Sequence, residues 1–258
     1  MKKHPPLRPV LWLLALLAAT PAFGGFKVYY IRHAEFGHNV VKQYENVPKD
    51  RRPAYVGDSD AVTPKGAEQI VAATAKLKKL RFDFIACSPI LRSRHTILPY
   101  LRDTGRAAEI WPELAEFGET TTVLLNNGGA LPKPGTDLFA GTPIQIPDAE
   151  APFFTLRPGA GNHFKAAPRD NRLQRAADTK AALEAVIARL RAAFAGTDKT
   201  VLLSGHGNNG KCLLRLMVPN HPRLARYHPK NTALWMVEEQ PGGAFALRLL
   251  DDKAVPEP

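Results

Sequence analysis

Two histidines, each at the end of an apolar run, are the residues of this sequence best placed to do chemistry. Arg32 and His33 follow the apolar and aromatic run Phe26–Ile31, and His206 follows the apolar run Thr200–Leu203. An imidazole can attack an electrophile or move protons near neutral pH, and a guanidinium beside it can hold an oxyanion through two parallel hydrogen bonds. These residue types indicate phosphoryl chemistry, although an Arg-His pair taken alone is more typical of a solvated loop.

A third group of candidates follows the apolar run Phe82–Cys87. Ser88 and Pro89 turn the chain into a predicted helix that carries Arg92 and Arg94 in its first two turns. The free N–H groups and the dipole at a helix start bind anions, so an arginine there can add to a phosphate site. A solvated surface position is the alternative interpretation of both arginines.

Hydrophobic periodicity predicts the elements that would position these groups. Thr63 and Pro64 supply the N-cap and the first position of a helix that should end near Leu80. Its predicted apolar face is spaced three and four residues apart and comprises Ala67, Ile70, Val71, Thr74 and Leu77. The order strand, helix, strand implies parallel pairing of the flanking strands with a right-handed crossover. Pro99 is expected to kink or end the helix that follows Ser88.

The C-terminal half also contains segments that predict helices and strands. A helix from Asp170 to Gly196 carries an apolar face made of Leu183, Val186, Ile187, Leu190 and Phe194. The segments Thr232–Glu238 and Ala244–Leu250 predict a hairpin at a sheet edge. Carboxyl ends of strands in a doubly wound sheet meet in one crevice. We therefore expect an α/β three-layer domain with a mainly parallel central sheet, and all three candidate groups in one crevice.

Residues 120–168 are expected to form an irregular cap over that crevice. The stretch is rich in proline and glycine and keeps no helical period. Long irregular stretches inside compact domains are usually functional lids or disordered. Phe153, Phe154 and Phe164 are more apolar than a disordered linker requires, which favours an ordered cap. The predicted domain is 25–258, with this insertion inside it.

The length and net charge of the chain limit the classes of partner that can be expected. The chain has 258 residues, 45% of them hydrophobic, and can bury one substantial core. Its formal net charge of +11 favours anionic partners. We find no nucleic-acid motif and no basic run with interleaved aromatics. A phosphorylated small molecule is therefore the expected partner and nucleic acid is not, while peripheral contact with an anionic membrane surface stays open.

Residues 1–24 have the layout of a secretory signal peptide, with a basic start, the apolar stretch Val10–Ala19 and small residues before Gly25. Cleavage before Gly25 and a periplasmic or secreted location are expected. An uncleaved anchor is the alternative, but the apolar stretch is shorter than the roughly 20 residues that span a bilayer. Cys87 and Cys212 lie in runs typical of buried segments, so we expect packed thiols rather than a disulfide.

Metal binding and serine hydrolysis are rival uses of these histidines. The sequence has no H-E-x-x-H and no Cys or carboxylate ligand pair at chelating spacing, so neither a metal nor a cofactor is expected. His206 lies in Ser204-Gly205-His206-Gly207, which lacks the G-x-S-x-G turn of a Ser-His-Asp hydrolase.

Five motifs stand in order along the chain: Arg32-His33-Ala34-Glu35 with Asn39, then Asp60 to Gln69, then Ser88-Pro89-Ile90-Leu91-Arg92, then Leu114-Ala115-Glu116, then His206-Gly207-Asn208. Together they resemble the histidine phosphatase superfamily, and most closely its phosphoglycerate-mutase-like branch (branch 1). The similarity spans residues 26–119 and 200–250. Two departures are Ala34, where the family usually has Gly, and residues 120–168, where nothing aligns.

The resemblance implies that His33 is a nucleophile that forms a phosphohistidine, that Arg32, Arg92 and His206 hold the phosphoryl oxygens, and that Glu116 is the proton donor. In-line attack by a neutral imidazole spreads charge over three equatorial oxygens, which preorganised positive groups stabilise without a metal. A carboxyl group with a raised pKa can protonate the leaving alkoxide and then activate water.

Asn39 and Gly207 are implied as further substrate-binding positions near the phosphate. Glu113 and Glu119 lie close enough in sequence to be mistaken for the proton donor, and we expect them to be exposed loop carboxylates.

The expected function is an exported, metal-independent phosphomonoesterase that acts through a phosphohistidine. One alternative is a phosphomutase or phosphotransferase of the same fold, against which export away from glycolysis argues. Another is a catalytically idle phosphate-binding envelope protein. The combined presence of His33, His206 and two arginines argues against it, because binding alone would not require the whole set.

Overall fold

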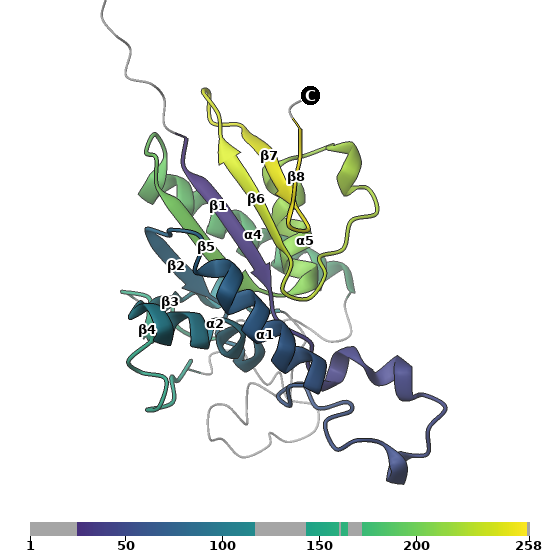
Figure 1. Cartoon of the computed structure of the whole chain (residues 1–258). Coiled ribbons are helices and arrows are strands. Elements are labelled where there is room, and N and C mark those ends of the chain that lie inside the picture. Colours follow the sequence, from purple (N-terminus) through teal and green to yellow (C-terminus); the bar gives the residue numbers. More distant parts are fainter. Residues whose placement is uncertain (1–24, 117–142, 160, 165–171, 257–258) are drawn as a thin grey trace, which may run out of the picture.

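An eight-stranded sheet runs through the protein, with strand order β4-β3-β2-β5-β1-β6-β7-β8 (Figure 1). The computed structural model describes residues 25–116, 143–159, 161–164 and 172–256. The strands are β1 (Lys27–Arg32), β2 (Phe84–Cys87), β3 (Ala108–Ile110), β4 (Phe154–Leu156), β5 (Thr200–Gly205), β6 (Leu234–Glu239), β7 (Phe245–Leu250) and β8 (Lys253–Ala254).

Helices connect these strands and cover the sheet. The α-helices are α1 (Pro64–Leu77), α2 (Leu91–Thr104), α4 (Arg172–Phe194) and α5 (Gly207–Met217). Short 3-10 helices are η1 (Gly37–Asn39), η2 (Val41–Tyr44), η3 (Lys49–Arg51), η4 (Pro112–Leu114) and η5 (Pro222–Leu224). Within the part of the chain that the structure describes, no helix is both long and apolar enough to cross a membrane.

The strands from β4 to β1 pair in parallel, and β6, β7 and β8 add an antiparallel edge. The predicted mainly parallel sheet and the β6–β7 hairpin are therefore confirmed. The predicted pairing of the first two strands is wrong, because β5 inserts between β1 and β2 and pairs with both. The order of elements along the chain does not reveal this insertion, since a strand far away in sequence can lie between two strands that are consecutive in sequence.

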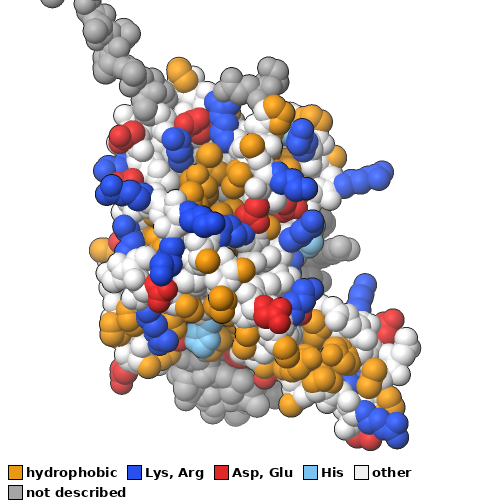
Figure 2. Space-filling view, in the orientation of Figure 1, with side chains coloured by type: hydrophobic (Ala, Val, Ile, Leu, Met, Phe, Trp, Pro, Cys, Tyr) orange, Lys and Arg blue, Asp and Glu red, His pale blue; other side chains and the backbone are white. Residues whose placement is uncertain are grey.

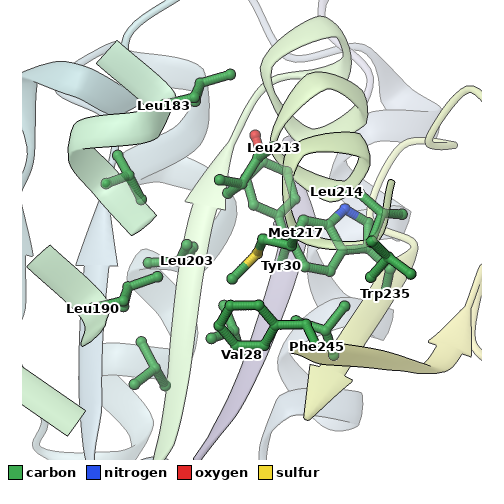
Figure 3. Packing of buried hydrophobic residues seen from close by; sticks show 14 of the residues in the cluster. Val28, Tyr30, Leu183, Leu190, Leu203, Leu213, Leu214, Met217, Trp235 and Phe245 are labelled. Carbon is green, nitrogen blue, oxygen red and sulfur yellow. The ribbon is translucent and has the colours of Figure 1, made fainter. Parts of the chain in front are cut away.

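The two faces of the sheet are covered by different helix pairs, as Figure 1 shows, with α1 and α2 on one face and α4 and α5 on the other. Alternate residues of a strand point to opposite faces. Val28 and Tyr30 of β1 belong to the cluster under α4 and α5, whereas Ile31 belongs to the cluster under α1 and α2. In Figure 3, Met217 of α5 lies beside Tyr30 of β1, and Leu190 of α4 lies next to Leu203 of β5. The α/β three-layer architecture is confirmed.

The start of α1 agrees with the prediction, and its apolar face does so only in part. The Thr63 hydroxyl accepts a hydrogen bond from the Gly66 N–H at 2.9 Å, and Pro64 is the first helical residue. Val71, however, is 72% exposed, whereas Ala73 is fully buried. Consecutive helical residues differ in direction by about 100°, so Val71 and Ala73 point nearly opposite ways and cannot both face the sheet.

Pro99 neither ends α2 nor separates it into two helices. The helix continues from Leu91 to Thr104 with the proline inside it. A proline removes one backbone hydrogen bond, but Ile97 and Leu101, on either side of it, are fully buried. Their packing keeps the helix together, since helices in proteins depend more on tertiary packing than on intrinsic propensity.

The stretch predicted as an irregular cap contains part of the core. Residues 154–156 form β4, which pairs in parallel with β3 at the end of the sheet. Phe154 and Phe164 are 1% and 6% exposed and belong to the cluster under α1 and α2. A cap confined to the surface is therefore wrong for this part. Residues 117–142 and 165–171 lie outside the described residues, as does the expected signal segment 1–24.

Cys87 and Cys212 are both free thiols, as expected from the sequence. Burial raises the pKa of the Cys87 thiol to about 12, which keeps it protonated and unreactive.

Candidate active site

The carboxyl ends of β1, β5 and β2 bring the predicted groups to one edge of the sheet. Arg32 lies beside Gly205 in the parallel β1–β5 register, so the next residues, His33 and His206, are also neighbours. The His33 N–H donates to the Gly205 carbonyl at 2.9 Å, and the two imidazole rings lie 5.4 Å apart between centroids. Ser88 joins them from the end of β2, where its N–H donates to the Ser204 carbonyl at 2.9 Å.

His33 is a neutral imidazole with one nitrogen left for chemistry. Its Nδ1 lies 2.7 Å from the Ala34 carbonyl, which can only accept, so the ring proton is on Nδ1 and Nε2 keeps its lone pair. Burial, then Arg92 and Arg32, hold the pKa of His33 well below its usual range. A buried imidazole with a free Nε2 lone pair beside two guanidinium groups is suited to nucleophilic attack on an anionic electrophile.

His206 is held at its backbone by Tyr30. The Tyr30 hydroxyl accepts from the His206 N–H at 2.6 Å and donates to the His206 carbonyl at 2.8 Å. At the ring, Ser88 Oγ lies 2.8 Å from Nε2, and Nδ1 lies 3.6 Å from Glu116 Oε2. A nitrogen that faces a carboxylate is more stable as a donor, so this geometry favours the proton on Nδ1, with Ser88 donating to Nε2. Burial and then Arg92 lower the pKa of His206 well below its usual range.

Arg92 and Glu116 face these histidines as an ion pair. Arg92 is fully buried, and its Nη2 donates to Glu116 Oε2 at 3.0 Å. Glu116 follows η4, where the Asn209 side-chain amide donates to the Ala115 carbonyl at 2.9 Å and so ties the loop to α5. The solvated-surface interpretation of Arg92 and Arg94 is therefore wrong, since Arg94 is also only 1% exposed.

Arg32, at the end of β1, is the second guanidinium of the site. Its Nη1 donates to the Pro229 carbonyl at 2.8 Å, while its buried Nε has no hydrogen-bond partner among the described residues. The predicted substrate-binding residue Gly207 lies against this guanidinium, because a Cβ there would stand 3.2 Å from Arg32 Nε. Glycine at this position lets the first residue of α5 pack closely against the Arg32 guanidinium.

Asn39, predicted to bind substrate, is engaged by protein groups. Its Oδ1 accepts from the Phe36 N–H at 3.0 Å, and its Nδ2 lies 2.9 Å from Nε2 of His38. The structure therefore places Asn39 as a support for His38. The sequence analysis missed His38, although it stands inside the first motif, and it missed the clamp formed by Tyr30.

Glu113 is not an exposed loop carboxylate. It is 5% exposed, and both its oxygens accept from Nη1 of Arg157, at 2.8 and 2.7 Å. Both carboxylates are in ion pairs, but only Glu116 lies beside a site histidine, with its Oε2 3.6 Å from Nδ1 of His206, which favours Glu116 as the proton donor. Glu119 lies outside the described residues.

A cavity of about 710 Å³ opens beside Glu116, between α4 and α5. Lys211 and Asn208 line it from α5, and Thr179 and Lys180 line it from α4. The cavity adjoins the carboxyl group expected to serve the leaving oxygen, so it has the position and volume to hold the alcohol part of an ester.

The donor set of the site suits an anion. Guanidinium groups and imidazole N–H groups converge there, and they bind tetrahedral oxyanions through charge-assisted hydrogen bonds. Over the described ranges, no group of three or more His, Cys, Asp or Glu side chains is arranged to hold a metal ion.

In a comparison with protein families, the family model of the histidine phosphatase superfamily (branch 1) matches residues 28–123. The resemblance inferred from the five motifs is thereby confirmed. Comparison with curated proteins gives no match.

Several solved structures share the fold. Bacillus stearothermophilus YhfR aligns with a TM-score of 0.54 at 19% identity, over 89% of this chain and 98% of that one. The alpha-ribazole phosphatase from Shigella flexneri aligns with a TM-score of 0.53 at 17% identity, over 90% and 99% of the two chains. A mycobacterial glucosyl-3-phosphoglycerate phosphatase complexed with VO3 aligns with a TM-score of 0.52 at 18% identity, over 88% and 99%. These likenesses confirm the expected fold.

Proposed function

From the premise that residues 28–123 match the histidine phosphatase superfamily (branch 1), we propose that this protein is a phosphomonoesterase that works through a phosphohistidine at His33. One observation carries the proposal. The Ala34 carbonyl fixes the proton of His33 on Nδ1, so that a neutral Nε2 faces a site lined by Arg32 and Arg92. Attack by neutral nitrogen on a phosphoryl group that two guanidinium groups hold needs no prior deprotonation.

In the first step, Nε2 of His33 forms a bond to phosphorus while the phosphorus–ester oxygen bond breaks. The nitrogen gains positive charge, which the Nδ1–H bond to the Ala34 carbonyl at 2.7 Å stabilises. Arg32, Arg92 and Nδ1–H of His206 stabilise the negative charge on the equatorial oxygens. The leaving alkoxide takes its proton from Glu116.

Arg92 also explains how Glu116 can carry that proton. In the free protein its guanidinium stabilises the carboxylate at 3.0 Å. A phosphoryl dianion bound to the same guanidinium repels the carboxylate and favours its protonated form. Substrate binding thus prepares the acid. In the second step Glu116 removes a proton from water, the water oxygen attacks phosphorus, and the phosphorus–nitrogen bond breaks to release phosphate.

A phosphorylated small molecule is the substrate class that this geometry supports best. The cavity beside Glu116 has a volume of about 710 Å³, which is in the range of small-molecule sites. On the face shown in Figure 2, Lys and Arg side chains are interspersed with Asp and Glu rather than gathered into one basic patch. That face offers no continuous track for a nucleic-acid backbone.

Export is part of the proposal, and it rests on the layout of residues 1–24. Processed material from the periplasm or the medium should begin at Gly25. N-terminal sequencing of that material would settle the matter, and recovery of Met1 would contradict cleavage.

The activity is tested with p-nitrophenyl phosphate, with and without a chelator. We expect turnover that the chelator does not change, and His33→Ala should abolish turnover of every phosphomonoester because it removes the covalent route. Wild-type protein that binds phosphate without turnover would instead support an idle binding protein. Transfer of the phosphoryl group to an added hydroxy acid, rather than to water, would support a phosphomutase.

A further inference from the structure

A third histidine lies at the candidate active site and has no role in the steps described above. His38 belongs to η1, the next element after β1, and its ring centroid lies 5.4 Å from that of His33. The rings of His38 and His206 thus lie at equal centroid distances from His33.

The protonation of His38 follows from its neighbour. Asn39 Oδ1 accepts from the Phe36 N–H at 3.0 Å, which fixes the orientation of the amide and turns its Nδ2 toward His38 Nε2 at 2.9 Å. A side-chain NH₂ group can only donate, so Nε2 of His38 must accept. The ring proton is therefore on Nδ1.

That Nδ1–H group is buried and has no hydrogen-bond partner among the described residues. Buried donors in native proteins are almost always paired, so a missing partner needs an explanation. A ligand atom that is absent from the free protein is one such partner.

The charges around His38 point to the nature of that ligand. Burial, followed by Arg92 and Arg32, lowers the pKa of His38 to about 3, so the ring is neutral near pH 7. The same two guanidinium groups also lower the pKa of His33, so both lie close enough to interact electrostatically with both rings. An anion bound between them would lie next to all three rings, and its oxygens would be acceptors.

We propose that His38 is a further substrate-binding residue, whose Nδ1–H donates to an oxygen of the phosphoryl group held by Arg32 and Arg92. The inference rests on the proposed function. It adds a neutral hydrogen-bond donor to the two cationic donors Arg32 and Arg92. It also gives Asn39, which the motif matches to a phosphate-binding position, an indirect role: Asn39 orients His38 by donating to its Nε2.

Inorganic phosphate is the probe, and binding is measured by calorimetry on the full chain near pH 7. The variants are His38→Phe, which keeps a ring without nitrogen, and His38→Asn, whose amide nitrogen can replace Nδ1 as a donor. A hydrogen bond to a charged acceptor is worth roughly a tenfold to hundredfold change in affinity. We expect His38→Phe to weaken phosphate binding by about that factor, and His38→Asn to stay within about threefold of wild type.

Equal affinity of wild type and His38→Phe would overturn the inference. Equal loss in both variants would also overturn it, because it would indicate that the ring serves packing or the position of Asn39. Nitrogen NMR of the wild-type protein gives a readout that does not depend on any variant folding. The Nδ1–H of His38 should be observed in the free protein and should shift when phosphate is added, and an unmoved resonance would contradict the contact.

Turnover of p-nitrophenyl phosphate by wild type is measured in parallel and separates the two proposals. If wild type turns over the ester but His38→Phe binds phosphate as well as wild type does, the role of His38 is refuted and the phosphatase function is not. Weakened phosphate binding in His38→Phe without wild-type turnover supports the role of His38 and refutes the phosphatase function.

Discussion

At the scale of single residues, the site depends on imidazoles that stay neutral while they lie close to arginines. His33 and His206 are 1% and 0% exposed, and burial is the first cause of their lowered pKa values. Burial therefore does two things at once. It keeps the His33 ring neutral and nucleophilic. It also keeps the His206 ring neutral, so that this ring does not compete as a cation with Arg92 for the Glu116 carboxylate.

The assignment of Glu116 as proton donor predicts a difference between two classes of ester. Glu116→Gln keeps the shape but cannot donate a proton, so alkyl phosphates, whose leaving group is strongly basic, should lose roughly 10²–10⁴-fold in rate. Nitrophenolate leaves without a proton. For the aryl ester the first step should persist and a phosphohistidine should accumulate, because activation of water also needs Glu116. Rapid-quench kinetics and phosphorus NMR check both points.

Glu113→Gln is the matched control, since that carboxylate is bound to Arg157. It should leave the ratio of alkyl to aryl rates unchanged. Equal slowing of both esters in Glu116→Gln, without a trapped intermediate, would show that the donor lies elsewhere.

Sequence reasoning located the residues that carry the motifs and missed the residues that orient them. His33, His206 and Arg92 stand at the ends of predicted strands or at a helix start, so topology alone brings them together. The clamp of Tyr30 on His206 could not be predicted in this way. It joins residues 176 positions apart through backbone atoms, and a buried tyrosine in a strand is typical of any core.

At the scale of elements, two buried ion pairs attach residues 143–164 to the domain. Arg94 on α2 donates to Glu150 at 2.6 Å, and Arg157 donates to Glu113 after β3. Burial raises the pKa of the Glu150 carboxyl, but His95 and Arg94 outweigh burial and hold it at about 2. The segment is thus fixed to the helix that also carries the catalytic candidate Arg92.

Glu150→Gln should destabilise the protein by roughly 3 kcal/mol, because it leaves the buried Arg94 without its counter-charge. The matched control is Glu184→Gln, which breaks the exposed pair with Lys180 and should cost at most about 0.5 kcal/mol. Urea unfolding at pH 7 measures both. A Glu150→Gln effect as small as the control would mean that the pair does not hold the segment.

Two deletions test which part of residues 120–168, predicted to cover the site, is needed for folding. Replacing residues 120–142 by a short Gly-Ser linker should leave a cooperative melting transition and should change which substrates are accepted. A deletion that extends to Phe164 removes β4 and two buried phenylalanines, and it should abolish that transition. Circular dichroism melting curves distinguish these outcomes. Loss of folding in the shorter deletion would show that residues 120–142 also belong to the core.

The elements that the sequence did not predict are short. β3 and β4 have three residues each and β8 has two, too few for a period of two to be recognised. Their place in the sheet depends on neighbours rather than on their own pattern. β4 pairs with β3 because the Ala108 N–H donates to the Phe153 carbonyl at 2.9 Å and sets the register.

At the scale of the whole molecule, the three site histidines should make stability depend on pH. Each has a lowered pKa in the folded protein, about 3 for His38, whereas an unfolded histidine titrates near pH 6.5. Below pH 6.5 the unfolded chain binds more protons than the folded one, so stability falls as pH falls. Each group contributes up to about 1.4 kcal/mol per pH unit until its folded pKa is reached.

We therefore expect the free energy of unfolding to decrease steeply from pH 6.5 to pH 5. Glu150, whose pKa is about 2, changes its contribution to stability only at lower pH. His38→Phe should reduce that slope by up to about 1.4 kcal/mol per pH unit. Urea titrations at half-unit intervals measure the slopes. Identical slopes in wild type and His38→Phe would contradict a neutral, buried His38.

The insertion of β5 between β1 and β2 has a consequence for the order in which the protein can fold. Lys27 of β1 pairs with Thr200, so neither of the two earlier strands has its inner neighbour until three quarters of the chain is available. Meanwhile, a chain that emerges N-terminus first presents β1 with neither neighbour and β2 with one edge unpaired, and such edges favour aggregation. Pairing between residues so distant in sequence is also slow. Nascent chains that stop before residue 200 should therefore need a holding chaperone, and reactivity toward phosphate esters should arise only after His206 has been synthesised.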